Sequence, residues 1–197
     1  MQGLLEQYPF IQASNYTRAG RTTAGLIVIH TMEAPEKPGT ARGVAEWFGG
    51  KGGAAPQASA HFCVGPDEVI QCVRLDDVAW HAPGANRVGI GIEHAGFAAQ
   101  TAEQWADASS QAILERSAKL CAEIMRAAGV SPGRLTPAQV KAGMSGICGH
   151  IDVTKAFPDE GHGHTDPGPN FPWDRYLALV SDALGSLASR AQGNGGG

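Results

Sequence analysis

The residues of this chain with the most evident chemistry lie in the tract 149–169. It holds His150, His162, His164 and Asp166 among several glycines and prolines, a composition that predicts a loop rather than a continuous helix or strand. Zinc accepts imidazole nitrogen and carboxylate oxygen, and a catalytic zinc keeps three protein ligands and one position open for water. The tract therefore predicts two or three ligands of a metal site, and it requires at least one more histidine from elsewhere.

His30 is the candidate for that additional ligand. It directly follows the unbroken apolar run 25–29, which predicts a strand buried on both faces, so its side chain can project from a sheet edge into a cleft. With His150 and Asp166 it gives a His, His, Asp set. Three such ligands leave the fourth tetrahedral position to a water whose pKa the metal lowers, and the pattern predicts hydrolysis.

Hydrolysis of a carbonyl compound also needs a base and a donor for the developing oxyanion. Glu93 ends the apolar strand 88–93 and is our candidate base; the alternative is an ordinary surface carboxylate. His164, two residues before Asp166, is the candidate donor. Its alternatives are a solvated loop histidine or another metal ligand.

Composition limits the classes of partner. The chain has 197 residues, 43% of them hydrophobic and 17% charged, which is typical of one globular domain with a real core. A net charge of -4 without a Lys/Arg cluster argues against nucleic acid as a partner. No apolar run approaches the roughly 20 residues that cross a bilayer, and the first residues do not resemble a signal peptide. We therefore expect no membrane partner and synthesis in the cytoplasm.

Strands and helices are mixed along the chain. Apolar runs predict strands at 25–29, 58–64, 69–75 and 88–93, the middle two forming a hairpin. Helical spacing predicts helices at 40–48, 102–128 and 172–188, with a shorter one opening at 136–137. We expect the first helix to present Val44, Trp47 and Phe48 to a core. The fold class predicted is α/β (α+β), a single domain with a central mixed β-sheet flanked by helices.

Segment boundaries and cysteines complete the prediction. We expect an N-terminal arm at 1–22, a catalytic domain at 23–190 and a flexible Gly-rich tail or linker at 191–197. The four cysteines contain no C-x-x-C pair, so we expect buried, apolar thiols. Cys63 and Cys72 lie on adjacent predicted strands, and whether they pair is left open.

Six short motifs occur in order along the chain: His30 at a strand end, Ser59-Ala60-His61-Phe62, Ala79-Trp80-His81-Ala82, Ile90-Gly91-Ile92-Glu93, Gly149-His150-x-Asp152-Val153 and Thr165-Asp166-Pro167-Gly168-Pro169. In this order and rough spacing they resemble the type-2 N-acetylmuramoyl-L-alanine amidases. This zinc family includes phage amidase lysozymes and a bacterial recycling amidase, and it shares its fold with peptidoglycan recognition proteins. The resemblance covers about residues 23–180.

The resemblance implies roles for individual residues. By that resemblance, Zn2+ is the cofactor, its ligands are His30, His150 and Asp166, and Glu93 matches a catalytic glutamate found in part of the family. It also implies sugar or stem-peptide contacts, for which the positions are His81 and Asn86, with Trp80 packing beneath them. For His61, inside a strand, we favour a structural role or one that supports the ligands.

Two departures from the family pattern involve the histidine-rich tract. The family commonly has Lys two positions before its third ligand, where this chain has His164. The tract is also longer than in many relatives, with 157–162 inserted, and we expect His162 to face the substrate.

The function expected is zinc-dependent hydrolysis of the amide between N-acetylmuramic acid and L-alanine in peptidoglycan, by the catalytic module of a phage endolysin acting on the bacterial wall. Alternatives are a non-catalytic peptidoglycan-binding module of the same fold and a cytoplasmic muropeptide-recycling amidase. A structural zinc domain would need a closed ligand set, against which three ligands argue. We expect a monomer.

Overall fold

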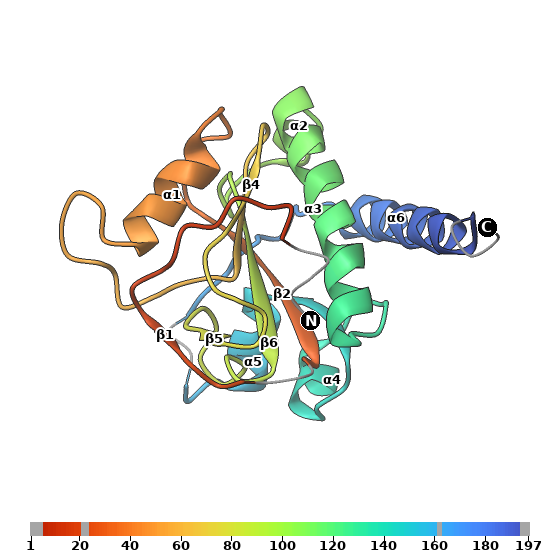
Figure 1. The fold of residues 1–197 in the computed structure, drawn as a ribbon. Helices are drawn as coiled ribbons and strands as arrows, with labels where there is room; N and C mark the ends of the chain where they lie inside the picture. The colour runs from red at the N-terminus through yellow and green to blue at the C-terminus, as the bar shows by residue number, and fades with distance from the viewer. Residues whose placement is uncertain (1–5, 21–23, 161–162, 194–197) are drawn as a thin grey trace.

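A five-stranded sheet runs through the middle of the molecule in the computed structural model, which describes residues 6–20, 24–160 and 163–193 (Figure 1). Its order is β4-β3-β6-β2-β7. β2 is parallel to β6 and β7, β3 is parallel to β6, and only β4 runs antiparallel to its neighbour β3. The strands are β2 (Leu26–Thr31), β3 (Phe62–Val64), β4 (Val69–Gln71), β6 (Gly89–His94) and β7 (Gly146–Gly149).

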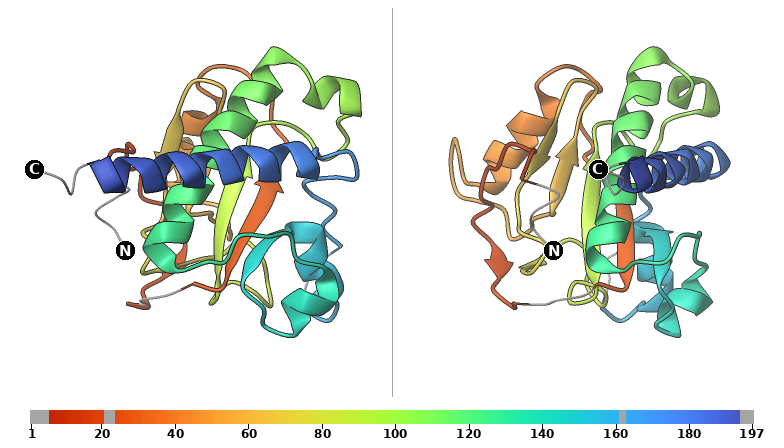
Figure 2. Two further views of the ribbon diagram at one scale, coloured as in Figure 1. Left: turned by 90° about the vertical axis from the view of Figure 1, so that its right-hand side faces the viewer. Right: turned by 45° about the vertical axis from the view of Figure 1, so that its right-hand side comes forward.

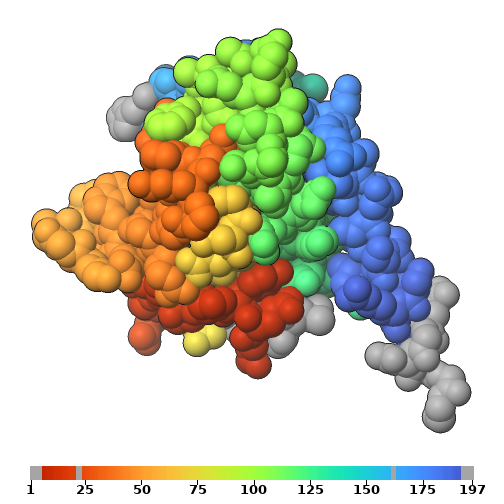
Figure 3. All heavy atoms as spheres, turned by 90° about the horizontal axis from the view of Figure 1, so that it is seen from above, coloured from red at the N-terminus to blue at the C-terminus, as the bar shows by residue number. Residues whose placement is uncertain are grey.

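Helices cover both faces of this sheet (Figure 2). α3 (Ala108–Ala128) and α6 (Trp173–Gly193) pack together over one face, and α1 (Thr40–Phe48) lies over the other, beside β3 and β4. α4 (Pro137–Lys141) and α5 (His150–Ala156) pack against β2 and β7. From above, α1 and α6 project from opposite sides of the body (Figure 3). The predicted fold class, a central mixed sheet flanked by helices, is confirmed.

Side-chain alternation on the two central strands divides the core. Ile27 and Ile29 of β2, together with Ile90 and Ile92 of β6, pack toward α3 and α6. The alternate residues of both strands face the opposite side, as the period of two in a strand requires. That second face carries His30 and Glu93 at its end. Burial of β2 on both faces explains why its sequence is an unbroken apolar run.

The predicted helix 102–128 is two helices, so this prediction was wrong in its continuity. α2 (Ala102–Trp105) ends at Trp105, and α3 starts after Asp107, whose carboxylate accepts the backbone N–H of Ser110. A polar residue that caps a new helix start competes with continuation of the old one. Apolar periodicity alone does not register that break.

The predicted hairpin has shorter strands than expected, and a second small ribbon accompanies it. β1 (Tyr16–Thr17) pairs antiparallel with β5 (Val78–Ala79), neither of which was predicted. The described part of the N-terminal arm also bonds to the sheet edge, where Ile11 N–H donates to the carbonyl of Gln71. This arm therefore covers the exposed edge of β4.

Two side-chain predictions have different outcomes. Trp47 was assigned to a core, but 51% of its surface is exposed, so that assignment was wrong. All four cysteines are buried, as expected, and all four are free. The sulfurs of Cys63 and Cys72 lie 3.8 Å apart without a bond between them.

Within the described part of the chain, no helix is both long and apolar enough to span a membrane.

A buried polar chain links the sheet to both large helices. His94 of β6 bonds through Nε2 to the Ser117 hydroxyl of α3, which lies 2.8 Å from the Tyr176 hydroxyl of α6. His94 is fully buried, and this burial, aided by His30, lowers its pKa to about 3. His94 therefore stays neutral in the folded protein over the whole range in which an exposed histidine titrates.

The buried His94 gives the fold a predictable acid sensitivity. The pKa of His94 is lower in the folded protein than in the unfolded chain, so as the pH falls the unfolded chain binds the proton first. Stability is therefore lost as the pH falls from about 6.5 toward 3. Between pH 7 and pH 5, protonation of His94 in the unfolded chain should lower the free energy of unfolding by about 2 kcal/mol. In His94→Gln, urea unfolding should show a pH dependence smaller by about that amount. An unchanged pH dependence would contradict the assignment; other histidines titrate in both proteins and cancel.

Candidate active site

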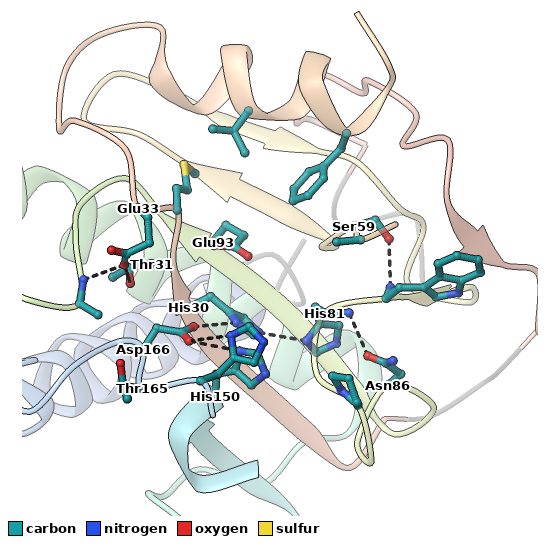
Figure 4. A pocket seen from close by; sticks show the side chains of 18 of the residues that line it. His30, Thr31, Glu33, Ser59, His81, Asn86, Glu93, His150, Thr165 and Asp166 are labelled. Carbon is teal, nitrogen blue, oxygen red and sulfur yellow. Dashed lines mark hydrogen bonds and ion pairs between the residues drawn. The ribbon is translucent and has the colours of Figure 1, made fainter. Parts of the chain in front are cut away.

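Three parallel strands carry polar side chains at or just after their carboxyl ends, at one end of the sheet. His30 and Glu93 are register partners near the carboxyl ends of β2 and β6. His150 follows the last residue of β7, the other neighbour of β2. In sheets of this kind, ligands bind outside the carboxyl ends of the strands. The sequence placed His30 and Glu93 at strand ends and His150 in a loop, and the structure brings all three together (Figure 4).

Asp166 joins the two histidines into one cluster. Its Oδ2 lies 3.0 Å from His30 Nδ1, and its Oδ1 lies 3.2 Å from His150 Nδ1. One ligand atom from each residue falls within 4.8 Å of the others, and all three residues are buried. The predicted set His30, His150 and Asp166 therefore has the proximity and the donor types that a single cation requires.

The protonation of this cluster follows from its contacts. Burial alone would raise the pKa of the Asp166 carboxyl, but hydrogen bonds from His150 and His30 outweigh it and hold the pKa well below its usual range. Burial lowers the pKa of His30, although Asp166 acts against that shift. The cluster thus combines an ionised carboxylate with an imidazole that favours its neutral, ligand-competent form.

The tract 149–169 is not a loop throughout, contrary to its prediction. His150 is the first residue of α5. Asp152 supports this helix start, because its Oδ2 accepts the Gly149 N–H at 2.8 Å and pairs with Arg134 at 2.7 Å. A carboxylate in the first turn satisfies donors that a helix otherwise leaves free. His150 is therefore fixed by a strand end, a helix start and a partly buried ion pair.

Asp166 is tied directly to that helix. The N–H of Ile151 donates to the backbone carbonyl of Asp166 at 2.9 Å, and the Asp166–Pro167 peptide is cis. Asp166 lies sixteen residues after His150, yet the hydrogen bond from Ile151 to Asp166 sets the two backbone segments side by side. It explains how a Gly- and Pro-rich segment can hold its carboxylate against two imidazoles.

Glu93 lies in the same pocket with a free carboxylate oxygen. Its Oε2 is buried and has no hydrogen-bond partner among the described residues. Burial raises the pKa of Glu93 well above its usual value, and the charge of Asp166 adds to that shift. The alternative of an ordinary surface carboxylate is therefore wrong. A buried carboxyl with a raised pKa and an unused oxygen is equipped to exchange a proton.

His164 stands over the cluster, partly exposed. Its ring stacks on that of His150 with centroids 4.0 Å apart and an angle of 19°, and its Nδ1 lies 3.8 Å from Asp166 Oδ1. Its side chain is 47% exposed toward the pocket that it lines. His162 falls outside the described residues, so the expectation that it faces the substrate stays a prediction.

The residues expected to contact substrate occupy the pocket wall behind His30. His81 Nδ1 lies 3.0 Å from His30 Nε2. Asn86 Oδ1 accepts the backbone N–H groups of His81 and Ala82. The Trp80 indole N–H donates to the Thr17 hydroxyl at 3.0 Å. His61 is fully buried and accepts the N–H of Gly91, in agreement with a structural role.

The pocket above the cluster has a volume of about 540 Å³. Its far wall comes from α1, through Val44, Trp47 and Phe48. Phe48 and Val44 also pack on the core, as predicted, whereas Trp47 faces only the pocket side and solvent. Helical periodicity identifies an apolar face but does not tell whether a core or a ligand lies against it. Glu33 was also missed; its carboxylate accepts from the Thr31 hydroxyl and the Ala98 N–H, and its φ of 51° is unusual for a residue other than glycine.

Comparisons with known proteins agree with this geometry. The family model described as N-acetylmuramoyl-L-alanine amidase matches residues 20–169. The chain is 31% identical over 183 residues to N-acetylmuramoyl-L-alanine amidase A of Achromobacter lyticus, covering 88% of this chain and 92% of that protein.

Solved structures share the fold at lower identity. The Staphylococcus aureus hydrolase AmiA, in complex with its ligand, has a TM-score of 0.67 at 18% identity, over 90% of this chain and 83% of AmiA. An AmpD derivative has a TM-score of 0.63 at 20% identity, over 91% and 98%. A mutant endolysin from Bacillus subtilis has a TM-score of 0.55 at 18% identity, over 88% of this chain and 99% of the endolysin. With its sequence matched across three-quarters of its length, the chain belongs to the type-2 N-acetylmuramoyl-L-alanine amidase family and is a peptidoglycan amidase.

Proposed function

We propose that this amidase is zinc-dependent, with His30, His150 and Asp166 as the metal ligands. The observation that carries the proposal is the convergence of three buried ligand atoms within 4.8 Å at the floor of an open pocket. Two imidazoles and one ionised carboxylate are a donor set that zinc accepts, and a set of three leaves a position for water or substrate. The ionised Asp166 also supplies negative charge that a buried cation needs.

The residues around the ligands divide the remaining chemistry. When bound, zinc supplies a Lewis acid that polarises a carbonyl oxygen and lowers the pKa of a water molecule. Glu93 takes a proton from the attacking water and returns it to the leaving amine, for which its free oxygen and raised pKa are suited. The bond broken joins the lactyl carbonyl of N-acetylmuramic acid to the nitrogen of L-alanine.

His164 is proposed to stabilise the oxyanion that forms on the carbonyl. Its ring is held by the stack on His150 and lies near Asp166, and its side chain is partly exposed where it lines the pocket. A donor aimed at developing charge acts most strongly where water is excluded. This is the position at which the family commonly carries a lysine, and either side chain supplies an N–H donor.

We further propose that the natural substrate is the polymeric wall, which an endolysin module would attack. The partly exposed Trp47 gives the open pocket an aromatic wall against which a sugar–peptide junction can pack. Purified sacculi and soluble anhydro-muropeptides, offered at equal amide concentration, separate this role from recycling. Faster release of stem peptide from the soluble substrate would favour the recycling role, and no release from either would leave a binding module.

Metal removal tests the ligand set. A chelator should abolish release of stem peptides from purified peptidoglycan, and added Zn2+ should restore it, because the three residues alone supply no Lewis acid. Asp166→Asn and His150→Ala should each lower bound zinc, measured by elemental analysis. His94→Gln, a buried histidine on the opposite face of the sheet, is the matched control and should retain zinc. Full activity of metal-free protein would refute the proposal.

Glu93→Gln tests the base. The substitution keeps the size and removes the titratable group, so zinc content should be unchanged while kcat falls by about 10²- to 10⁴-fold. The measurement is stem-peptide release by mass spectrometry beside elemental analysis of the same sample. Turnover at the wild-type rate would exclude Glu93 as the base.

His164→Ala and His164→Lys test the oxyanion donor as a pair. Loss of the donor should lower kcat by about 10²- to 10³-fold, whereas lysine should restore most of the rate. Zinc content serves as the control for both variants. If alanine leaves kcat unchanged, or if it releases the metal, His164 is not the donor.

A further inference from the structure

His81 and Asn86 lie where a substrate contact is expected, yet their contacts point to the metal ligands. His30 uses both ring nitrogens: Nδ1 lies 3.0 Å from Asp166 Oδ2, and Nε2 lies 3.0 Å from His81 Nδ1. We infer that His81 is a positioning residue for His30, fixing the tautomer and ring orientation with which His30 holds the metal. This inference rests on the proposed zinc site.

Metal binding would fix the tautomer of His30. Nδ1 lies 3.0 Å from Asp166 Oδ2 and can donate to that carboxylate when no metal is bound, but as a ligand Nδ1 must be unprotonated. A neutral imidazole then carries its single proton on Nε2, and that proton requires an acceptor. His81 Nδ1 is at hydrogen-bond distance from it. Metal-bound histidines generally depend on such an acceptor for orientation and affinity.

The position of His81 is itself fixed by the sequence around it. The backbone N–H groups of His81 and Ala82 both donate to Asn86 Oδ1, at 2.9 and 2.7 Å. This places the turn that carries the imidazole against β6. Asn86 therefore acts as an internal support of the turn, and its carbonyl oxygen is already engaged twice.

Glycine in β6 makes room for the ring. A Cβ at Gly91 would lie 2.7 Å from His81 Cγ, closer than packed atoms allow, and one at Gly89 would lie 3.2 Å from His81 Cε1. On its other side, the His81 ring meets the buried ring of His61 edge-on, with centroids 5.7 Å apart. Only 8% of His81 is exposed, so it is enclosed by the protein and directed at His30.

Two variants of nearly equal size separate the acceptor from the space it fills. His81→Asn retains an oxygen at the δ position, whereas His81→Leu does not. For each purified full chain, the zinc dissociation constant is measured by competition with a chromogenic chelator. His81→Leu should weaken zinc binding by about 10- to 100-fold, and His81→Asn should stay near the wild-type value. The visible spectrum of the Co2+-substituted proteins should change in the same order.

The outcomes distinguish this inference from the proposal beneath it. Unchanged zinc affinity in His81→Leu with a raised KM would make His81 a substrate contact and overturn the inference alone. Absence of zinc binding by the wild-type chain would overturn both. If His81→Leu does not fold, Gly91→Ala replaces it, because the added methyl displaces the His81 ring and keeps every polar group. Zinc affinity should then fall in Gly91→Ala, and wild-type affinity there would also overturn the inference.

Discussion

The site depends on parallel pairing of β2 with both β6 and β7. This pairing brings three carboxyl strand ends together at one end of the sheet, and the register that places His30 opposite Glu93 leaves the proposed ligand and the proposed base on the same face. A shift of one residue would turn Glu93 into the core beneath α3, exchanging it with His94 or Ile92. The packing of Ile90 and Ile92 against α3 and α6 holds that register. The core is therefore the device that aligns the site.

Two carboxyl groups within this pocket are driven in opposite directions by their surroundings. Asp166 is bonded to two imidazoles, and its pKa falls; Glu93 is buried with an unpaired oxygen, and its pKa rises. Separation of this kind lets one carboxyl remain an anion while the other exchanges protons. The difference comes from partners rather than from residue type, because His30 and His150 lie on the side of Asp166. The imidazoles hold Asp166 ionised, and the charge of Asp166 in turn raises the pKa of Glu93.

Much of this arrangement could be predicted from the sequence, and the failures have physical causes. Strand-end positions identified His30 and Glu93, and the ligand chemistry of a Gly- and Pro-rich tract identified His150 and Asp166. The start of α5 was missed because Asp152 and Arg134, which stabilise it, meet only in the folded chain. The contact between His81 and His30 joins residues 51 apart, and no local pattern encodes it. The sequence did not predict which partners each polar group contacts in the folded protein.

The two glycines of β6, Gly89 and Gly91, are explained by the His81 ring that packs against them. Glycine weakens a strand, because it costs more backbone entropy and offers no side chain to pack. In β6 these glycines occupy the face that carries Glu93, while the opposite face keeps its isoleucines and its contacts with α3. The sheet thus accepts a local loss of stability on the side where the imidazole of His81 packs closely against the backbone. A departure from strand preference confined to one face is what a site built against a sheet should produce, since the core on the other face still holds the strand in place.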